Sequence, residues 1–459
     1  MLRVFECFAG YGSQSMSLKD LGIEHKVVGI SEIDPDAIIG YGAIRYKLDD
    51  IEINKDISID DMRKELISKN IGKDFKTGKS QITRMKKDKL ERLYKFNKMS
   101  NNFGDISIID PTLIPDFDYM TYSFPCTDIS IAGAQKGIIK NNTRSGLLYE
   151  CEKIIEIKKP KYLLMENVKA LLSKKFLSQF NEWCEYLENL GYTNYYKVLN
   201  AKDFGIPQNR ERVFVVSILG EHSPYVMPNG FPLEKRLKDF LEENIEEKYY
   251  LSDEIQKRFK QTKADDGNNN IIGTTAPDFR TIGYKDLVYG KNAKTMGTLL
   301  ATDYTQPKQI IDKIITVKDK NELNYHKNRM LSDAFCNKME KHEKVVQTLD
   351  EIKVNRIGGI FETKKSKHQF GSIYSNNGLP PTLSTTQGGY AMPLTEESNY
   401  KIRKLTPKEC LRLMGVSDDN IEKMKSIGLS NSSLYKLAGN SIVKQCLDSI
   451  HKELFKDIM

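Results

Sequence analysis

The chain of 459 residues is long enough to bury a sizeable core and to form two or more domains. Its formal net charge of +8 indicates an acidic partner, and nucleic acid is the first candidate. Hydrophobic residues make up 39% of the chain, but no apolar run is long enough to cross a bilayer, so we expect no membrane association. The N-terminus lacks a signal-peptide pattern, and the seven scattered cysteines without a CxxC pair argue against a disulfide framework and for the cytoplasm. Neither these cysteines nor the six histidines have ligand spacing, so we predict no metal.

The first 220 residues are predicted to alternate strands with helices. Apolar runs predict strands at 4–8, 27–30, 105–109, 118–122, 161–165 and 213–218, and helices are predicted at 13–22, 146–158 and 174–190. This alternation is typical of a parallel sheet covered by helices on both faces. Ligands of such sheets bind at the carboxyl ends of the strands, which is where the polar blocks of this chain fall.

A glycine turn follows the first predicted strand. Gly10 and Gly12 permit a tight turn, but the third glycine of a dinucleotide-binding pattern is absent, so the turn alone is a weak signal. Glu32 strengthens it, because a carboxylate at the end of the next strand can accept both hydroxyls of a ribose. A solvated strand end is the alternative for Glu32, and a helix N-cap is the alternative for Asp105.

Three short blocks carry groups suited to attack on a nitrogen heterocycle. They are Ser123-Phe124-Pro125-Cys126, Met165-Glu166-Asn167-Val168 and Gln208-Asn209-Arg210-Glu211-Arg212. A thiolate can act as the nucleophile, a carboxyl can handle a ring proton, and an arginine can bind a ring carbonyl. A lone cysteine is usually a small core residue, and each of the other blocks could be a surface turn or edge, so it is their order that favours chemistry.

With Phe8-Ala9-Gly10-Tyr11-Gly12 near the start and Gly439-Asn440-Ser441 near the end, these blocks resemble those of bacterial and phage DNA (cytosine-5)-methyltransferases. The resemblance covers residues 4 to about 220 and about 403 to 450. It implies an α/β fold, with a Rossmann-like S-adenosylmethionine-dependent methyltransferase sheet, helices on both faces, and a smaller, mostly irregular or β target-recognition domain. It also implies methyl transfer from S-adenosyl-L-methionine to C5 of a flipped cytosine in double-stranded DNA.

The resemblance assigns a role to each matching residue. Cys126 adds to C6 of the cytosine, Glu166 serves N3 and the exocyclic amine, and Arg212 holds the O2 carbonyl with Arg210 assisting. Glu32 would bind the ribose, Ile33 the adenine ring and Asp105 its amino group. The full expected cofactor set is Phe8, Ala9, Gly10, Gly12, Glu32, Ile33, Asp105, Ile106, Ser123, Pro125, Leu147, Asn440 and Ser441. The residues expected on the DNA are Phe124, Asn167, Val168, Gln208, Thr382 and Leu383.

Three regions are expected: a catalytic and cofactor-binding domain at 1–220, a target-recognition domain at 221–400, and a segment at 401–459 that returns to the first domain. Residues 233–250 are predicted to be a charged helix, and Thr406 with Glu409 a capping box of purely structural importance. Both Thr298-Leu299 and Thr382-Leu383 fit the Thr-Leu pair of the family's recognition domain, and we favour the second. An ordinary irregular β domain is the alternative for this middle region.

A basic insertion, at about 47–102, departs from the usual spacing of the family. Within it, residues 62–98 hold thirteen Lys or Arg and four Asp or Glu, a net charge of +9. Apolar residues at 66, 67, 90, 93 and 96 permit one or two helices around a turn that contains glycine and lysine. The insertion is either a solvated helical hairpin or a clamp on the DNA backbone beside the catalytic cleft.

Other functions remain to be weighed. A transfer-RNA cytosine-5 methyltransferase would use the same cysteine and glutamate, but about 180 residues between the arginine and terminal blocks suit duplex reading better. A catalytically silent DNA-binding relative is disfavoured by the intact Cys126, Glu166 and Arg212. We expect a cytoplasmic monomer of a restriction-modification system, linked to a cognate restriction endonuclease functionally and not physically.

Overall fold

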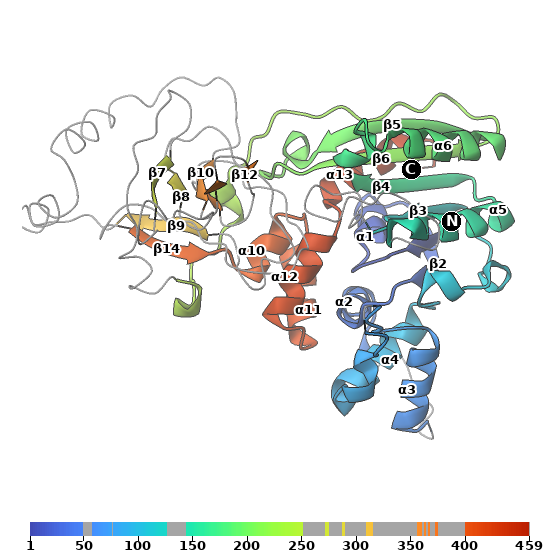
Figure 1. Ribbon diagram of the computed structural model, residues 1–459, viewed down its shortest axis with the longest axis horizontal. Coiled ribbons are helices and arrows are strands. Elements are labelled where there is room, and N and C mark those ends of the chain that lie inside the picture. Colours follow the sequence, from blue (N-terminus) through green and yellow to red (C-terminus); the bar gives the residue numbers. More distant parts are fainter. Residues whose placement is uncertain are drawn as a thin grey trace, which may run out of the picture. The chain divides into compact units, whose positions relative to one another are not determined.

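A computed structural model describes residues 1–48, 57–75, 77–125, 144–250 and 400–458, with seven short strands between residues 271 and 374 (Figure 1). The chain forms two compact units. Unit 1 contains Met1–Ile206, Arg210–Pro232 and Cys410–Met459, and unit 2 contains Pro207–Asn209 and Leu233–Glu409. Among the described residues, no helix is long and apolar enough to cross a membrane, and no group of three or more His, Cys, Asp and Glu side chains could hold a metal ion.

Unit 1 is built on a six-stranded sheet of order β2-β1-β3-β4-β6-β5. Its strands are β1 Leu2–Cys7, β2 His25–Ser31, β3 Tyr119–Tyr122, β4 Tyr162–Val168, β5 Tyr192–Asn200 and β6 Glu211–Leu219. The first four strands in this order are parallel, whereas β6 runs antiparallel to both β4 and β5. The sheet is therefore mixed and not wholly parallel, and the carboxyl end of β4 meets the amino end of β6.

Two strand predictions were wrong. Residues 105–109 do not form a strand, because Asp105 caps a short 3-10 turn, η3 Ile106–Ile108, by accepting a hydrogen bond from Ser107 N at 3.0 Å. Strand β5 was not predicted at all. It lies at the edge of the sheet and pairs only with β6, so its residues are mostly half-buried and lack a clear apolar pattern.

Helices cover both faces of this sheet, as expected. They include α1 Ser13–Asp20, α2 Pro35–Arg45, α5 Leu148–Lys158, α6 Leu177–Asn189 and α13 Lys444–Leu454. Helices α11 Asp418–Ser426 and α12 Asn431–Asn440 contact α2. Met120 and Leu163 face α5 and α6 in one buried cluster. Tyr119, the neighbour of Met120, points the other way and its hydroxyl lies 2.8 Å from Nε2 of His451 in α13. Burial lowers the pKa of His451 to about 3, so this ring is neutral.

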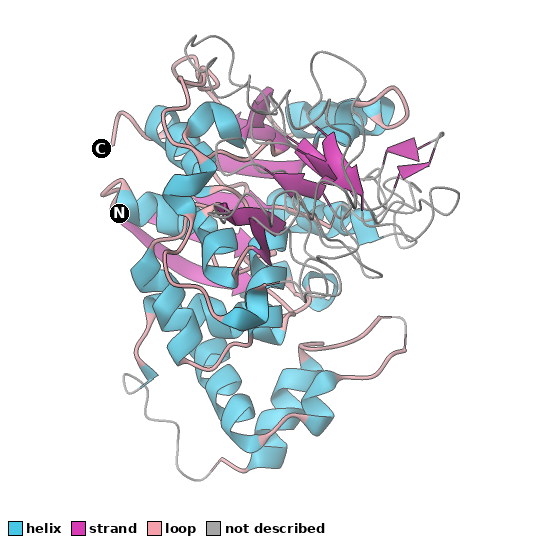
Figure 2. Ribbon diagram, turned by 90° about the vertical axis from the view of Figure 1, so that its left-hand side faces the viewer, coloured by secondary structure: helices cyan, strands magenta, loops and turns pink. Residues whose placement is uncertain are grey.

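The basic insertion forms two helices, α3 Ile59–Ser68 and α4 Lys87–Met99, joined through the short turn η2 Gln81–Arg84. Leu66, Leu90, Leu93 and Phe96 are buried, whereas Ile67 is exposed. Figures 1 and 2 show these helices at the bottom of the view, below the strands, and α4 packs against α2. The insertion is thus a folded extension of unit 1 and not a loose hairpin.

The described strands of unit 2 are short: β7 Ile271–Thr274, β8 Leu287–Tyr289, β9 Gln309–Ile314, β10 Arg356–Gly359, β11 Glu362–Thr363, β12 Ser366–Lys367, β13 Ser372–Tyr374 and β14 Tyr400–Lys404. Four of them form a sheet of order β10-β13-β9-β14. The helix predicted at 233–250 is absent. Two 3-10 turns, η8 Leu237–Phe240 and η9 Glu247–Tyr249, occur instead. Glutamates at 242, 243, 246 and 247 would repel one another at helical spacing, which disfavours a continuous helix.

The capping box before α10 (Pro407–Arg412) is present. Thr406 N donates to a carboxylate oxygen of Glu409 at 2.8 Å, and Glu409 N donates to Thr406 Oγ1 at 3.2 Å. Glu409 also binds the guanidinium of Arg403 through two hydrogen bonds of 2.8 Å, and neither side chain is exposed to solvent. This buried pair was not predicted from the sequence, although it fixes the strand-to-helix junction.

Replacing Arg403 with methionine should lower the free energy of unfolding by about 3–5 kcal/mol, because Glu409 would remain buried without its partner. Urea denaturation measures the loss. The matched control is Arg412→Met, since Arg412 pairs with Asp418 at 2.6 Å at a partly exposed site, and its loss should cost at most about 1 kcal/mol. Equal destabilisation by the two variants would contradict this account.

Candidate active site

A turn with three left-handed residues connects β1 to α1. Phe8, Gly10 and Gly12 have φ values of 56°, 57° and 79°. A Cβ atom at Gly12 would lie 2.6 Å from the ring of Tyr41, so glycine is required there by packing. A Cβ at Gly10 would meet nothing within 4 Å, so the turn is open on that side. The sequence-predicted turn therefore has one packed glycine and one glycine beside open space.

A buried polar network that the sequence did not predict supports this turn. Glu6, which is fully buried, accepts hydrogen bonds from Ser15 N at 3.0 Å and from the Tyr41 hydroxyl at 2.7 Å. Arg45 donates to the carbonyl oxygens of Tyr11 at 2.9 Å and Gly12 at 2.6 Å. The backbone of the turn is therefore held by side chains from β1, α1 and α2.

Glu32 lies directly beneath the turn. Its Oε2 accepts a hydrogen bond from Gly10 N at 2.9 Å, and its Oε1 accepts from Ile33 N and Asp34 N, both at 2.8 Å. Burial raises the pKa of Glu32, while these three backbone donors oppose the shift. Asn102 binds the Glu32 backbone on both sides, through Oδ1 at 3.0 Å and Nδ2 at 2.9 Å. The structure thus bonds Glu32 to Gly10 of the glycine turn and to the backbone of Ile33.

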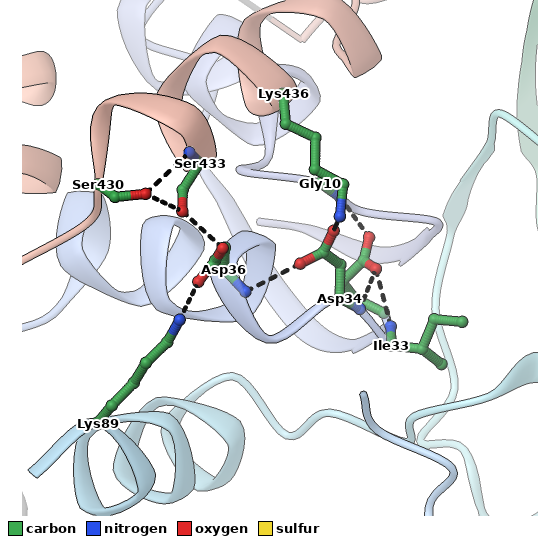
Figure 3. A network of polar contacts seen from close by, with 9 residues as sticks. Gly10, Ile33, Asp34, Asp36, Lys89, Ser430, Ser433 and Lys436 are labelled. Carbon is green, nitrogen blue, oxygen red and sulfur yellow. Dashed lines mark hydrogen bonds and ion pairs between the residues drawn. The ribbon is translucent and has the colours of Figure 1, made fainter. Parts of the chain in front are cut away.

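Acidic residues after Glu32 tie this loop to two distant segments (Figure 3). Asp34 forms an ion pair with Lys436 of α12. Asp36 binds Lys89 of α4 at 2.6 Å and the Ser433 hydroxyl of α12 at 2.6 Å. The basic insertion and the C-terminal helices are consequently bonded to the same short loop.

Asp105 is buried and its two carboxylate oxygens have different partners. Oδ1 accepts from Ser107 N, so the N-cap interpretation is correct, and Oδ2 accepts from Asn70 Nδ2 at 2.8 Å. The insertion also binds this region through its backbone: Asp105 N donates to Lys69 O at 3.0 Å, and Gly72 N donates to Ile33 O at 2.8 Å. Asn70 is therefore a member of the site that the sequence did not reveal. The neighbouring Ile106 packs in the core.

The C-terminal block reaches the glycine turn. The hydroxyl of Tyr11 donates to Ser441 Oγ at 2.8 Å, while Asn440 at the end of α12 is exposed. Arg210 donates from Nη2 to the carbonyl oxygens of Gly439 at 3.1 Å and Ser441 at 2.7 Å. In this structure, therefore, Arg210 binds the C-terminal segment within unit 1.

The predicted carboxylate and arginine meet where β4 ends and β6 begins. Glu166 lies opposite Phe214 and Val168 lies opposite Arg212, so Glu166 and Arg212 are diagonal neighbours across the strand pair. Arg212 Nε lies 3.1 Å from Glu166 Oε1. Burial raises the pKa of Glu166, and the positive charges of Arg212 and Arg210 oppose this shift.

The segment that leads to Cys126 reaches the same edge. Strand β3 pairs in parallel with β4, and beyond its end Phe124 O accepts a hydrogen bond from Asn167 Nδ2 at 3.1 Å. Asn167 Oδ1 accepts from Val168 N at 2.8 Å. The residue after Glu166 therefore anchors the chain two positions before Cys126. Cys126 itself lies outside the described residues.

The remaining predicted residues are placed as follows. Ser123 and Pro125 are half-buried beside Phe124, and Leu147 is half-buried at the end of the 3-10 turn Arg144–Leu147. Ala9 is buried within the glycine turn. Gln208 is fully buried and belongs to unit 2. Thr298, Leu299, Thr382 and Leu383 lie outside the described residues.

The sequence model of a family described as C-5 cytosine-specific DNA methylase matches residues 70–456. The chain belongs to this family. It is 40% identical over 459 residues to the Type II methyltransferase M2.ScrFI of Lactococcus lactis subsp. cremoris, with 99% of each chain covered. It is 28% identical over 497 residues to the orphan methyltransferase M.SPRI of Bacillus phage SPR, covering 99% of this chain and 97% of that one.

The fold agrees with this membership. A crystal structure of the Dnmt2 methyltransferase of S. pombe superimposes with a TM-score of 0.52 at 15% sequence identity and covers 100% of this chain and 99% of that chain. The methylase activity of the family is the transfer of a methyl group from S-adenosylmethionine to C5 of cytosine in DNA. The residues expected around the cofactor fit this molecule chemically. The half-buried carboxylate of Glu32 is bonded to Gly10, which is open on one side, and the buried carboxylate of Asp105 is bonded to Asn70.

Proposed function

We propose that this enzyme methylates cytosine within one short sequence of double-stranded DNA, with Cys126, Glu166 and Arg212 carrying the chemistry. The observation that supports this most strongly is the buried Glu166–Arg212 pair. Glu166 can carry a proton and Arg212 is a fixed positive charge, and both lie at the edge of the sheet that Phe124 reaches. A nucleophile at position 126 would therefore act near two groups that can neutralise charge on a pyrimidine ring.

In the proposed reaction, the Cys126 thiolate forms a bond to C6 of cytosine, and the electron pair of the C5–C6 double bond becomes available at C5. Glu166 donates its proton to N3, so that negative charge does not accumulate on the ring, while Arg212 binds the O2 carbonyl. When bound, S-adenosylmethionine would supply an electrophilic methyl group, and C5 would bond to its carbon as the sulfur–methyl bond breaks, leaving S-adenosylhomocysteine. A base then removes the C5 proton, the C5–C6 double bond forms again, the thiolate leaves and the N3 proton returns to Glu166.

For the cofactor, we propose that Glu32 binds the ribose hydroxyls and Ile33 packs on the adenine. Oδ2 of Asp105, which already accepts a hydrogen bond from Asn70, would also accept one from the adenine amino group. Phe8 and Gly10 would lie along the methionine part, and Ser441 would bind its carboxylate end. The lining is completed by Ala9, Gly12, Ile106, Ser123, Pro125, Leu147 and Asn440.

The target base must leave the duplex, because a stacked cytosine cannot present both a ring face and its pairing edge to these groups. Phe124 and Val168 are proposed to border the flipped base, and Gln208 is proposed to contact the DNA. Asn167 uses its side chain within the protein, so we propose that it holds the loop before Cys126. Target recognition is assigned to residues 221–400 and, within them, to Thr382-Leu383.

A role in a restriction-modification system is supported by the relative named as a Type II methyltransferase. We propose a monomer that acts in the cytoplasm and shares a recognition sequence with a restriction endonuclease without binding it. The alternative substrate, transfer RNA, is retained as an outcome of the test.

The test is to incubate the protein with labelled S-adenosylmethionine and either plasmid DNA or transfer RNA, and to locate 5-methylcytosine by bisulfite sequencing. We expect label in DNA alone, at one cytosine of a single recurring sequence. The Glu166→Ala variant, which keeps the proposed cofactor residues, controls for contaminating activity. Label in transfer RNA, or scattered over unrelated DNA sequences, would contradict the proposal.

A further inference from the structure

The basic insertion contains a surface pocket of about 370 Å³ between η2 and the start of α4. Its lining comprises Gln81, Met85, Lys86, Asp88, Lys89 and Arg92. Asp88 and Arg92 of α4 are four residues apart and share one side of the helix, with Lys89 next to them, whereas Gln81 begins η2 and Met85 follows it. The same helix buries Leu90, Leu93 and Phe96. The pocket therefore lies beside a helix that is packed into unit 1.

The charges around the pocket are only partly neutralised within the protein. Lys89 is committed to Asp36 at 2.6 Å, and Lys87 lies 3.8 Å from Glu91. By contrast, Nε of Arg92 is buried without a hydrogen-bond partner among the described residues. From 79 to 92 the sequence has six Lys or Arg and two Asp or Glu, a net charge of +4. The remaining positive charge lies on Lys79, Arg84, Lys86 and Arg92, and the carboxylate of Asp88, which also lines the pocket, offsets one unit of it.

The backbone at the pocket adds to this preference for anions. Lys86 occupies the N-cap position of α4 and its side chain makes no capping hydrogen bond. The first N–H groups of a 13-residue helix, with their positive partial charge, therefore lie beside Lys86 without a side-chain acceptor there. Cationic side chains and helix N–H groups together are what proteins use to bind phosphate.

We propose that this pocket, flanked by Arg84, binds backbone phosphates of the DNA duplex next to the methylated cytosine. The proposal rests on the DNA substrate named above and adds a contact surface to it. We infer DNA as the occupant because α4, which lines the pocket, is bonded through Lys89 to Asp36. Asp36 lies four residues after Glu32, at the end of the sheet where the cofactor is proposed to bind. Contacts to phosphates position a protein on DNA and do not select the sequence.

The test is the salt dependence of DNA binding by the full chain. In a triple variant, Arg84→Gln, Lys86→Gln and Arg92→Gln, the slope of log affinity against log salt should flatten by about two to three units, since each neutralised phosphate contributes about 0.9. The affinity at low salt should fall for target and non-target duplexes alike. The methylated sequence should stay the same. A double variant without the Arg92 change, which alters exposed residues only, should flatten the slope by about one to two units.

The matched control removes three exposed positive charges elsewhere in unit 1, through Lys19→Gln, Lys26→Gln and Lys452→Gln. It changes the net charge equally and should leave the slope within about half a unit of the wild-type value. If the wild type methylates DNA but the wild type and both pocket variants show equal slopes of log affinity against log salt, the proposed phosphate site is overturned. Absence of DNA methylation by the wild type would instead overturn the proposed function.

Discussion

Replacing Cys126 with alanine should lower the rate of DNA methylation by at least about 10⁴-fold, because no other group can form the bond to C6. Binding of S-adenosylmethionine should change by less than about twofold. Glu32 and Asp105, which are proposed to hold the cofactor, are bonded to the glycine turn and the insertion. Single-turnover transfer of labelled methyl groups and calorimetric binding of the cofactor measure the two quantities separately.

Cys184→Ala is the control for this experiment, since Cys184 is half-buried in α6 and is assigned no chemistry. It should methylate DNA at nearly the wild-type rate. A Cys126→Ala enzyme that retained a tenth of the activity would show that the thiol is not the nucleophile. Loss of both activity and cofactor binding would assign Cys126 to the structure of the site.

Replacing Glu166 with glutamine should lower the single-turnover rate by about 10²- to 10⁴-fold, the usual contribution of a positioned general acid. Burial raises the pKa of Glu166, so its carboxyl keeps the proton to higher pH than an exposed glutamate does. As the pH rises through that pKa the proton is lost, and the wild-type rate should decline on the alkaline side.

The pH profile distinguishes this chemical role from a structural one. Glutamine cannot ionise, so the Glu166→Gln enzyme should lose the alkaline limb that the carboxyl imposes. Lys169, just after β4, and Glu211, at the start of β6, form an exposed pair at 2.8 Å and provide the control through Glu211→Gln, which should keep the wild-type profile. An unchanged pH profile in the Glu166→Gln enzyme would contradict proton donation.

Local patterns in the sequence predicted the parts of the site that depend on local structure. Each of these parts consists of residues a few positions apart at the end of a strand or helix. They are the glycine turn, Glu32 at the end of β2 and the Thr406–Glu409 box. Contacts between distant residues leave no such pattern. Asn70 meets Asp105 across 35 positions, and Asn102 meets Glu32 across 70, so neither was predicted.

The strand errors have the same origin. Strand β5 is an edge strand whose side chains are mostly half-buried, and without a buried face the apolar period of a strand is weak. The run at 105–109 is apolar enough for a strand, but the Asp105 cap and the bond to Asn70 turn the chain there. Burial by tertiary contacts decided both cases.

Charge composition predicted the basic character of the insertion but not which cations are available. A count of +9 treats Lys89 and Arg92 as equivalent. In the fold, Lys89 is paired with Asp36, whereas Arg92 lines the pocket with its Nε unbonded among the described residues. A substitution of Lys89 would therefore break its bond to Asp36 as well as remove a charge from the pocket.

Covalent trapping tests the central claim, that Cys126 attacks C6 of cytosine, most directly. DNA with 5-fluorocytosine at the target position cannot lose fluorine as a cation, so the reaction should stop with the protein bonded to the base after methyl transfer. We predict a denaturation-resistant complex whose peptide map places the adduct on Cys126, and no complex with the Cys126→Ala protein. An adduct on any other residue, or methylation of ordinary DNA without trapping, would contradict this mechanism.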